Sequence, residues 1–174
     1  HGYADAQPHY DRAIDLWDRV PDPAERAGLD RAGLLERAAN AASITDLERA
    51  MALMTMALES APVDADRTRI ALLKERFGRY AWLMGDGLTA IDACREAAAL
   101  VPPEPPTRDR ARVLASLGQI LMVTGDMDGA EPAAREAVRI ARSASARDLE
   151  THALTTLGVC TAYLGDLDGG LAQL

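Results

Sequence analysis

Hydrophobic residues recur along this chain at intervals of three and four, the spacing that places them on one face of an α-helix. Between His9 and Val20, for example, Ala13, Ile14 and Trp17 share such a face. Segments rich in Pro, Gly, Asp and Ser interrupt the pattern and favour turns. The pattern predicts an all-α chain with helices over residues 9–20, 23–43, 46–59, 66–84, 86–100, 107–124, 126–142, 143 or 145 to 164, and 166–174.

Three of the predicted turns contain the same dipeptide, Gly followed by Asp, each 40 residues after the previous one. Glycine reaches the left-handed backbone conformation that commonly ends a helix, because it has no Cβ atom to clash. Aspartate favours the N-cap of the next helix, where its carboxylate accepts hydrogen bonds from free backbone N–H groups. We therefore predict helix–turn–helix units at the structural turn residues Gly85, Asp86, Gly125, Asp126, Gly165 and Asp166.

Small residues recur with the same 40-residue period on both sides of these turns. A glycine lies seven residues before each turn glycine, and an alanine or glycine lies five residues after it. Small side chains at these places allow the two helices of a pair to cross closely. Because a period of this length is typical of stacked helix pairs, the chain is predicted to be an α-solenoid. The small residues are Gly78, Gly118, Gly158, Ala90, Ala130 and Gly170, followed by Ala97 and Ala137.

The period divides one domain into helix pairs. Residues 1–22 are predicted to form a partial repeat, 23–62 repeat 1, 63–102 repeat 2, 103–144 repeat 3 and 145–174 a truncated repeat 4. Repeat 1 has Thr45 before Asp46 instead of glycine, and a β-branched residue resists the left-handed conformation, so this turn is expected to differ. The chain begins at His1 without an initiator methionine and ends at Leu174 inside an unfinished helical pattern, which suggests a fragment of a longer chain.

Proline, threonine and serine set the expected limits of several helices. Loops are predicted at residues 61–64 and, as a stiffer break with four prolines, at 101–106. Thr107 and either Ser143 or Ser145 are expected to cap the helices that follow. Pro132 is predicted to kink its helix or to delay the helix start to near Glu131, because proline removes a backbone hydrogen bond.

The composition favours tightly packed helices with few aromatic contacts. Aromatic residues make up 4% of the chain, so packing is expected to rely on Ala and Leu. Met51, Met54 and Met56 fall at helical spacing and are predicted to fill the core rather than to form an adaptable binding surface.

The charge of the chain excludes one class of partner. A net charge of −8 and a pI of about 4.9 argue against direct nucleic-acid binding by this segment, because phosphate recognition needs a clustered basic surface. No apolar run approaches the roughly 20 residues that cross a bilayer, and no charged-then-apolar leader begins the chain. A cytoplasmic protein that does not contact membranes is therefore expected.

The residues most often used for metal binding do not form a cluster. Cys94 and Cys160 fall in helical stretches without a CxxC spacing, so two reduced and mostly buried thiols are expected. His1, His9 and His152 are far apart in sequence and lack ligand spacing. No metal site is predicted.

Two short motifs resemble ligand-binding loops but have the wrong context. Residues 85–90 match G-x-G-x-x-A, yet dinucleotide binding needs that loop to follow a β-strand, and a helix is predicted before it. Residues 126–129 and 166–169 share the D-x-D-G start of a calcium loop without its later ligands. Because no catalytic constellation can be assembled either, we expect no enzyme, no catalytic residues and no cofactor.

Taken together, these features resemble the tetratricopeptide repeat (TPR) over nearly the whole chain. The resemblance rests on the Gly-Asp turns and the periodic alanines. It also rests on two Leu-Gly pairs, Leu117-Gly118 and Leu157-Gly158, and on two prolines 40 residues apart, Pro62 and Pro102. The period of 40 residues departs from the family's 34. Phe77 stands in place of the leucine of one Leu-Gly pair, and residues 81, 121 and 161 replace the family's usual aromatic residue. The resemblance implies a right-handed solenoid of antiparallel helix pairs.

Repeats with such longer helices are similar to those in the sensor region of MalT-like bacterial regulators. Those proteins join an ATPase domain, a helical-repeat region and a C-terminal LuxR-type DNA-binding domain. The segment from His9 to Pro21, including Leu16-Trp17-Asp18-Arg19-Val20-Pro21, also resembles the start of that helical-repeat region. The resemblance implies a regulatory segment that binds a peptide, a protein or a small-molecule effector and contacts flanking domains of its parent chain.

The resemblance also implies that the first helix of each pair lines a concave groove. The residues carried over to groove-facing positions offer aromatic stacking area, arginines for a carboxylate or phosphate, and directional hydrogen bonds. They are Glu75, Arg79, Trp82, Arg112, Gln119, Met122, His152, Thr155 and Tyr163. The alternative is that they form a solvated or inter-helix surface.

Two other functions remain open at this point. One is a general scaffold for protein–protein interaction or oligomerisation, which the broad groove favours and which allows self-association. The other is a segment attached to a catalytic domain, such as a nucleotide cyclase or a kinase.

Overall fold

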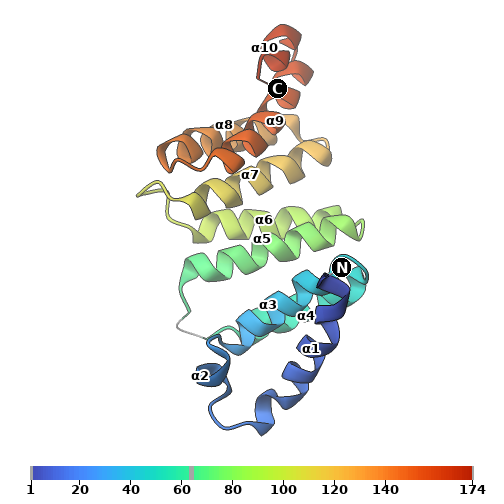
Figure 1. Ribbon diagram of the computed structural model, residues 1–174. Helices are drawn as coiled ribbons and strands as arrows, with labels where there is room; N and C mark the ends of the chain where they lie inside the picture. The colour runs from blue at the N-terminus through green and yellow to red at the C-terminus, as the bar shows by residue number, and fades with distance from the viewer. Residues whose placement is uncertain (1, 63–64, 174) are drawn as a thin grey trace.

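The structure is a computed structural model that describes residues 2–62 and 65–173. Figure 1 shows its helices stacked in antiparallel pairs, and the residues that it describes contain no strand. His1, Leu174 and residues 63–64 of the predicted loop lie outside the described residues. The helices are α1 (Gly2–Leu16), the 3-10 helix η1 (Trp17–Arg19), α2 (Pro23–Ala27), α3 (Arg31–Ala42), α4 (Leu47–Ser60), α5 (Arg67–Leu83), α6 (Gly87–Leu100), α7 (Arg108–Val123), α8 (Met127–Ser143), α9 (Arg147–Tyr163) and α10 (Leu167–Leu171).

The predicted turns join the two helices of three pairs. Gly85 takes a φ of +86°, and the N–H of Asp86 donates to the carbonyl of Ala81 at 2.9 Å, which closes α5. The Asp86 carboxylate accepts from the N–H of Thr89 at 3.0 Å and caps α6. The same arrangement recurs at residues 125–126 and 165–166, where φ is +92° and +110°. The structure thus has a left-handed glycine and a capping aspartate at each of these three turns.

The small residues bring the helices of three pairs, α5–α6, α7–α8 and α9–α10, into backbone contact. A Cβ added to Gly118 would lie 3.2 Å from the backbone nitrogen of Ala134, and one added to Gly170 would lie 2.5 Å from the carbonyl oxygen of Gly158. Gly78 meets Cys94 and the backbone of Ala90 in the same way. The prediction of close crossings is confirmed.

The first pair uses a different turn, as Thr45 led us to expect. Here the N–H groups of Thr45 and Asp46 both donate to the carbonyl of Ala42, and Thr45 is not among the residues with positive φ. Asp46 still caps α4 by accepting from the N–H of Arg49 at 2.9 Å.

The amino-terminal helices differ from the prediction. The helix expected over residues 9–20 spans Gly2–Leu16, and Trp17 lies in a 3-10 turn. The helix expected over residues 23–43 is broken, because Gly28 takes a φ of +65° and ends α2. Asp30 then starts α3 by accepting from the N–H of Gly33 at 2.8 Å.

The expected cap of α9 is wrong, and one of the two effects expected of Pro132 does not occur. Neither Ser143 nor Ser145 caps α9, whose N-cap is Ala146. Ser145 instead takes a φ of +54° and ends α8 in the place that glycine fills elsewhere. Pro132 does not delay α8, which begins at Met127, because the Asp126 cap already fixes the first turn and proline costs only one later hydrogen bond.

The remaining cap agrees with the prediction. Thr107 caps α7, and its hydroxyl accepts from the N–H of Arg110 at 3.1 Å. This helix therefore begins directly after the proline-rich loop.

The core consists of alanine, leucine and a few larger side chains. Of the three methionines predicted to fill it, Met54 is fully buried and Met51 is partly buried against the core, whereas Met56 is exposed. No helix in the described part of the chain is long and apolar enough to cross a membrane.

We predict that Gly125→Ala lowers the free energy of unfolding by about 1–2 kcal/mol, since a Cβ there meets no atom and the penalty comes from the left-handed backbone alone. Urea unfolding followed by circular dichroism measures the change. Thr45→Gly is the control, and it is expected to destabilise slightly because glycine gains only unfolded-state entropy. A gain in stability from Thr45→Gly would contradict this account of the first turn.

Candidate functional site

A pocket of about 390 Å³ opens between the first helices of three successive pairs, α3, α5 and α7. We call it the first-helix pocket. It combines amide, hydroxyl, guanidinium and aromatic groups with aliphatic side chains. Its lining residues are Asn40, Ser43, Arg79, Tyr80, Trp82, Leu83, Gln119, Ile120 and Val123.

The 40-residue period explains why these residues meet. Asn40, Tyr80 and Ile120 occupy the same position in three successive repeats, and so do residues 43, 83 and 123. Equivalent positions of stacked repeats lie side by side. The pocket is therefore a row of equivalent positions whose side chains differ.

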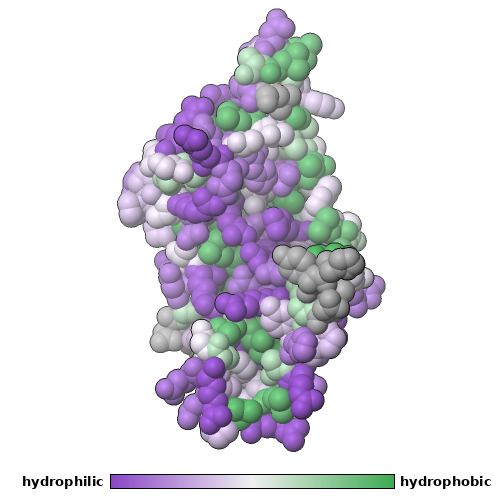
Figure 2. Space-filling model, in the orientation of Figure 1, coloured by the Kyte–Doolittle hydropathy of each residue, from purple (hydrophilic) through white to green (hydrophobic). Residues whose placement is uncertain are grey.

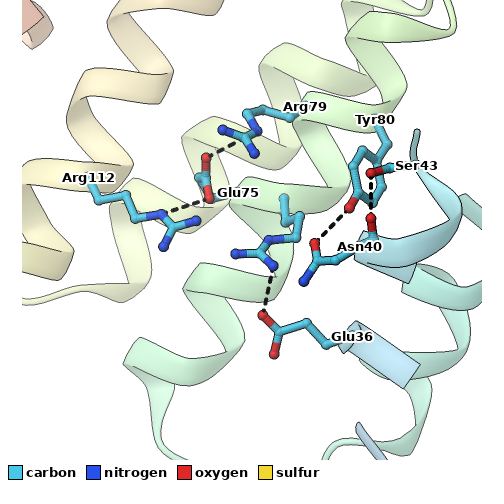
Figure 3. Close-up of polar contacts among 8 residues, drawn as sticks. Glu36, Asn40, Ser43, Glu75, Arg79, Tyr80 and Arg112 are labelled. Carbon is cyan, nitrogen blue, oxygen red and sulfur yellow. Dashed lines mark hydrogen bonds and ion pairs between the residues drawn. The ribbon is translucent and has the colours of Figure 1, made fainter. Parts of the chain in front are cut away.

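Hydrogen bonds hold part of the pocket wall in place. The Tyr80 hydroxyl donates to Asn40 Oδ1 at 2.9 Å, and the Ser43 hydroxyl donates to the Asn40 carbonyl at 2.9 Å (Figure 3). Tyr80 is buried, whereas Trp82 and Arg79 are exposed to solvent. The pocket thus has a fixed wall and accessible side chains for a ligand.

A buried carboxylate lies beside the pocket. Glu75 of α5 is 1% exposed, and it accepts from the Ser116 hydroxyl at 2.7 Å and from Arg112 Nε at 3.2 Å. Arg79 Nε lies 3.9 Å from Glu75 Oε1, which is too long for a hydrogen bond. Figure 3 shows both arginines converging on Glu75 from α5 and α7. The buried charge is paired as burial requires, and the Arg79 guanidinium retains donors for a ligand.

Further ion pairs join successive first helices. Arg76 of α5 contacts Glu36 of α3 at 3.2 Å, and Arg108 of α7 contacts Asp148 of α9. Both pairs join residues 40 positions apart. The row of first helices is therefore connected by polar contacts as well as by apolar packing.

His152 of α9 lies close to this polar cluster. Burial lowers the pKa of His152 below its ordinary value, and the positive charge of Arg79 lowers that pKa further, while the negative charge of Glu75 opposes the shift. The two charges that act on His152 are those of Arg79 and Glu75 in this cluster.

The predicted groove residues divide into three groups. Arg79, Trp82 and Gln119 line the first-helix pocket, and Glu75, Arg112 and His152 adjoin it through the polar cluster. The other three lie elsewhere: Met122 packs against a small core cluster, Thr155 donates to the Thr151 carbonyl, and Tyr163 is 76% exposed at the end of α9.

Sequence reasoning missed the rest of the pocket lining. The missing residues are Asn40, Ser43, Tyr80, Leu83, Ile120 and Val123. The signal that finds them is the 40-residue period itself, because all six fall at two repeat positions. The projection used only the groove positions of a shorter repeat family and so passed over them.

The two cysteines are not among the residues that line the first-helix pocket. Both are free and buried, as predicted. Burial raises the pKa of the Cys94 thiol to about 12, and Glu75 adds to the effect, so the thiol stays protonated at neutral pH. Among the residues described, no group of three or more His, Cys, Asp or Glu side chains could hold a metal ion.

Comparison with known proteins identifies the fold. No protein-family model and no curated protein sequence matches this chain. Among solved structures, BtubC (BKLC) from P. vanneervenii is similar with a TM-score of 0.81 and 16% identity, covering 99% of this chain and 70% of that protein. A variant of a putative kinesin light chain from Podosopora anserina, with nearly identical TPR-like repeats, gives a TM-score of 0.75 at 11% identity, covering 98% and 82%.

A third similar structure is YrrB, described as a TPR protein with an unusual peptide-binding site. Its TM-score is 0.64 at 16% identity, and the match covers 95% of this chain and 75% of YrrB. These similarities confirm the predicted fold class, a TPR-like α-solenoid of antiparallel helix pairs.

We predict that Glu75→Ala lowers the free energy of unfolding by about 1–3 kcal/mol, because it leaves Arg112 and the buried Ser116 hydroxyl without their shared partner. Urea unfolding measures the change. Asp148→Ala is the control: its ion pair with Arg108 is exposed on both sides, so little change is expected. Equal losses in the two variants would show that the burial of Glu75 does not matter.

We also predict that the pKa of His152, measured by NMR titration, lies below 6.5 and rises towards that value in Arg79→Gln. Because the folded pKa is lowered, the unfolded state binds the proton first, and this residue reduces stability as the pH falls below 6.5. Arg31→Gln, a change of the same kind on α3 whose ion pair is with Asp18, should leave the titration unchanged. If His152 has the same pKa in Arg79→Gln as in the unchanged protein, the proximity of the two residues is contradicted.

Proposed function

We propose that this chain is a protein-interaction scaffold that binds an extended peptide segment of a partner protein in the first-helix pocket. The observation that carries the proposal is the pocket itself, which is lined from three successive first helices. Packed helices lie about 8–10 Å apart, and an extended chain advances about 3.3 Å per residue. A peptide of roughly six residues therefore crosses all three helices.

The lining suits a peptide with an apolar side chain next to polar backbone groups. The amides of Asn40 and Gln119 match the donor and acceptor pattern of a peptide backbone. Trp82 and Leu83 provide apolar contact area, and Arg79 donates to a carbonyl or carboxylate. In ligand pockets with such a mixed lining, the apolar walls supply contact area and a few polar groups fix the orientation of the ligand.

The similar solved structures support a scaffold better than the regulatory context that the sequence suggested. They are TPR-like repeat proteins, and one of them is described as having a peptide-binding site. The LuxR-type parent, the small-molecule effector and the cytoplasmic location stay predictions. The scaffold proposal needs none of them.

Random-peptide phage display against the 174-residue chain tests the proposal. Selected peptides are then titrated against Trp82→Ala and Arg79→Ala by isothermal titration calorimetry. We expect each change to weaken binding by about tenfold or more, because aromatic and arginine side chains carry much of the affinity of protein interfaces.

Lys74→Ala is the matched control. Lys74 lies five residues before Arg79 on α5 and contacts Glu96 in a separate hollow, which α4, α5 and α6 line. Lys74→Ala should therefore change the affinity for the selected peptides little. Peptides that bind all three variants equally, or a library from which nothing is enriched, would contradict the proposal, provided that thermal melts show each variant to be folded.

A further inference from the structure

Most of the exposed large hydrophobic side chains among the described residues lie at the turns inside the helix pairs. Figure 2 shows hydrophobic atoms along the right-hand edge, where the α5–α6 and α7–α8 turns lie in Figure 1. Leu88 is 80% exposed and Leu83 is 63% exposed. We call this surface the turn edge, and its apolar residues are Ile44, Leu83, Met84, Leu88, Val123, Tyr163, Leu164 and Leu167.

The turn edge follows from the repeat. Ile44, Met84 and Leu164 occupy one repeat position, and residues 83, 123 and 163 occupy the position before it. Because the first helices all run in the same direction, their carboxyl ends and turns fall on one side of the solenoid. Single exposed hydrophobic residues are ordinary, whereas eight of them gathered along one side of the molecule favour an interaction surface.

The same edge is acidic. Every turn contributes the aspartate that caps its second helix, and the turns after α7 and α9 each add another aspartate two residues later. Across residues 43–49, 83–89, 123–129 and 163–169 the only basic residue is Arg49. The acidic residues in these segments are Asp46, Glu48, Asp86, Asp126, Asp128, Asp166 and Asp168.

We propose that the turn edge docks a basic amphipathic helix of a partner protein. The apolar face of such a helix would cover the exposed aliphatic side chains, and its Lys or Arg residues would meet the aspartates. A second copy of this chain fits less well, because it would bring one acidic edge against another. An anionic membrane surface is disfavoured for the same reason.

The probe is a synthetic peptide of leucine and lysine, about 18 residues and ~27 Å long as a helix, with all leucines on one face. Binding to the 174-residue chain is measured by fluorescence anisotropy at low and high salt. A scrambled peptide of the same composition controls for net charge. We expect the amphipathic peptide to bind about tenfold or more tightly than the scrambled one, with affinity falling as salt rises.

Two pairs of substitutions separate the apolar and the acidic contributions. Leu88→Ser with Leu167→Ser removes exposed aliphatic area outside the first-helix pocket, and should weaken binding by about tenfold. Asp128→Asn with Asp168→Asn removes two charges that do not cap a helix, and should reduce both the affinity and its salt dependence.

A third pair is the matched control for the loss of charge. Glu59→Gln with Glu104→Gln also removes two negative charges, and both residues are exposed. They lie at or beyond the carboxyl ends of the second helices α4 and α6, away from the turn edge. This pair should leave the affinity nearly unchanged.

The proposal is overturned if the scrambled peptide binds equally, or if the control pair weakens binding as much as the aspartate pair. It is also overturned if light scattering shows self-association that Leu88→Ser with Leu167→Ser abolishes, because the edge then joins two copies. Arg79→Ala, a change in the first-helix pocket one turn before the turn edge, should not weaken binding of the amphipathic peptide. Failure at this edge is therefore distinguishable from failure at the pocket.

Discussion

Contact between helix backbones at paired small residues fixes the geometry of the α5–α6, α7–α8 and α9–α10 hairpins. Gly118 and Ala130, twelve residues apart, face each other so closely that a Cβ on Gly118 would lie 3.4 Å from the Ala130 carbonyl oxygen. Gly78 with Ala90, and Gly158 with Gly170, repeat the contact at the same offset. Because the spacing inside each pair is constant, the pairs share one shape and stack with equivalent positions aligned. The contacts between repeats depend on that alignment.

The alignment turns a sequence period into specific polar contacts. Tyr80 bonds Asn40, and Arg108 pairs with Asp148, each across 40 residues. At one repeat position the side chains are the amide of Asn40, the phenol of Tyr80 and the aliphatic chain of Ile120. Equivalent backbone positions therefore carry different side chains, and the surface that they form does not repeat. The fold therefore comes from the residues that recur, and the pocket from those that vary among equivalent positions.

The sequence predicted the features that depend on local backbone chemistry and period. Turn glycines, aspartate caps and small crossing residues have one physical reason each, so the pattern alone identified them. It failed where two local signals compete. The apolar spacing of a helix continues past Gly28, so the pattern did not predict the break before α3. Ser145 adopts a left-handed conformation that its side chain disfavours, so a capping role was predicted for it instead. The partners of buried Glu75 depend on how α5 and α7 stack, which no local pattern encodes.

The two surfaces differ in how far the fold determines them. One aspartate of each turn caps a helix, so acidity along the turn edge accompanies the repeat wherever its turns are kept. In contrast, no cap or helix crossing requires Arg79, Trp82 or Gln119, and their positions are open to any residue that tolerates a helix surface. A chain with a net charge of −8 nevertheless gathers three arginines around two glutamates beside the pocket, namely Arg76, Arg79 and Arg112 around Glu36 and Glu75. Arg76 and Arg112 pair with glutamates across the stacked first helices, so folding accounts for both. Arg79 lies 3.9 Å from Glu75, too far for a hydrogen bond, and under the proposed function it is the arginine of this group whose position reflects binding rather than the repeat.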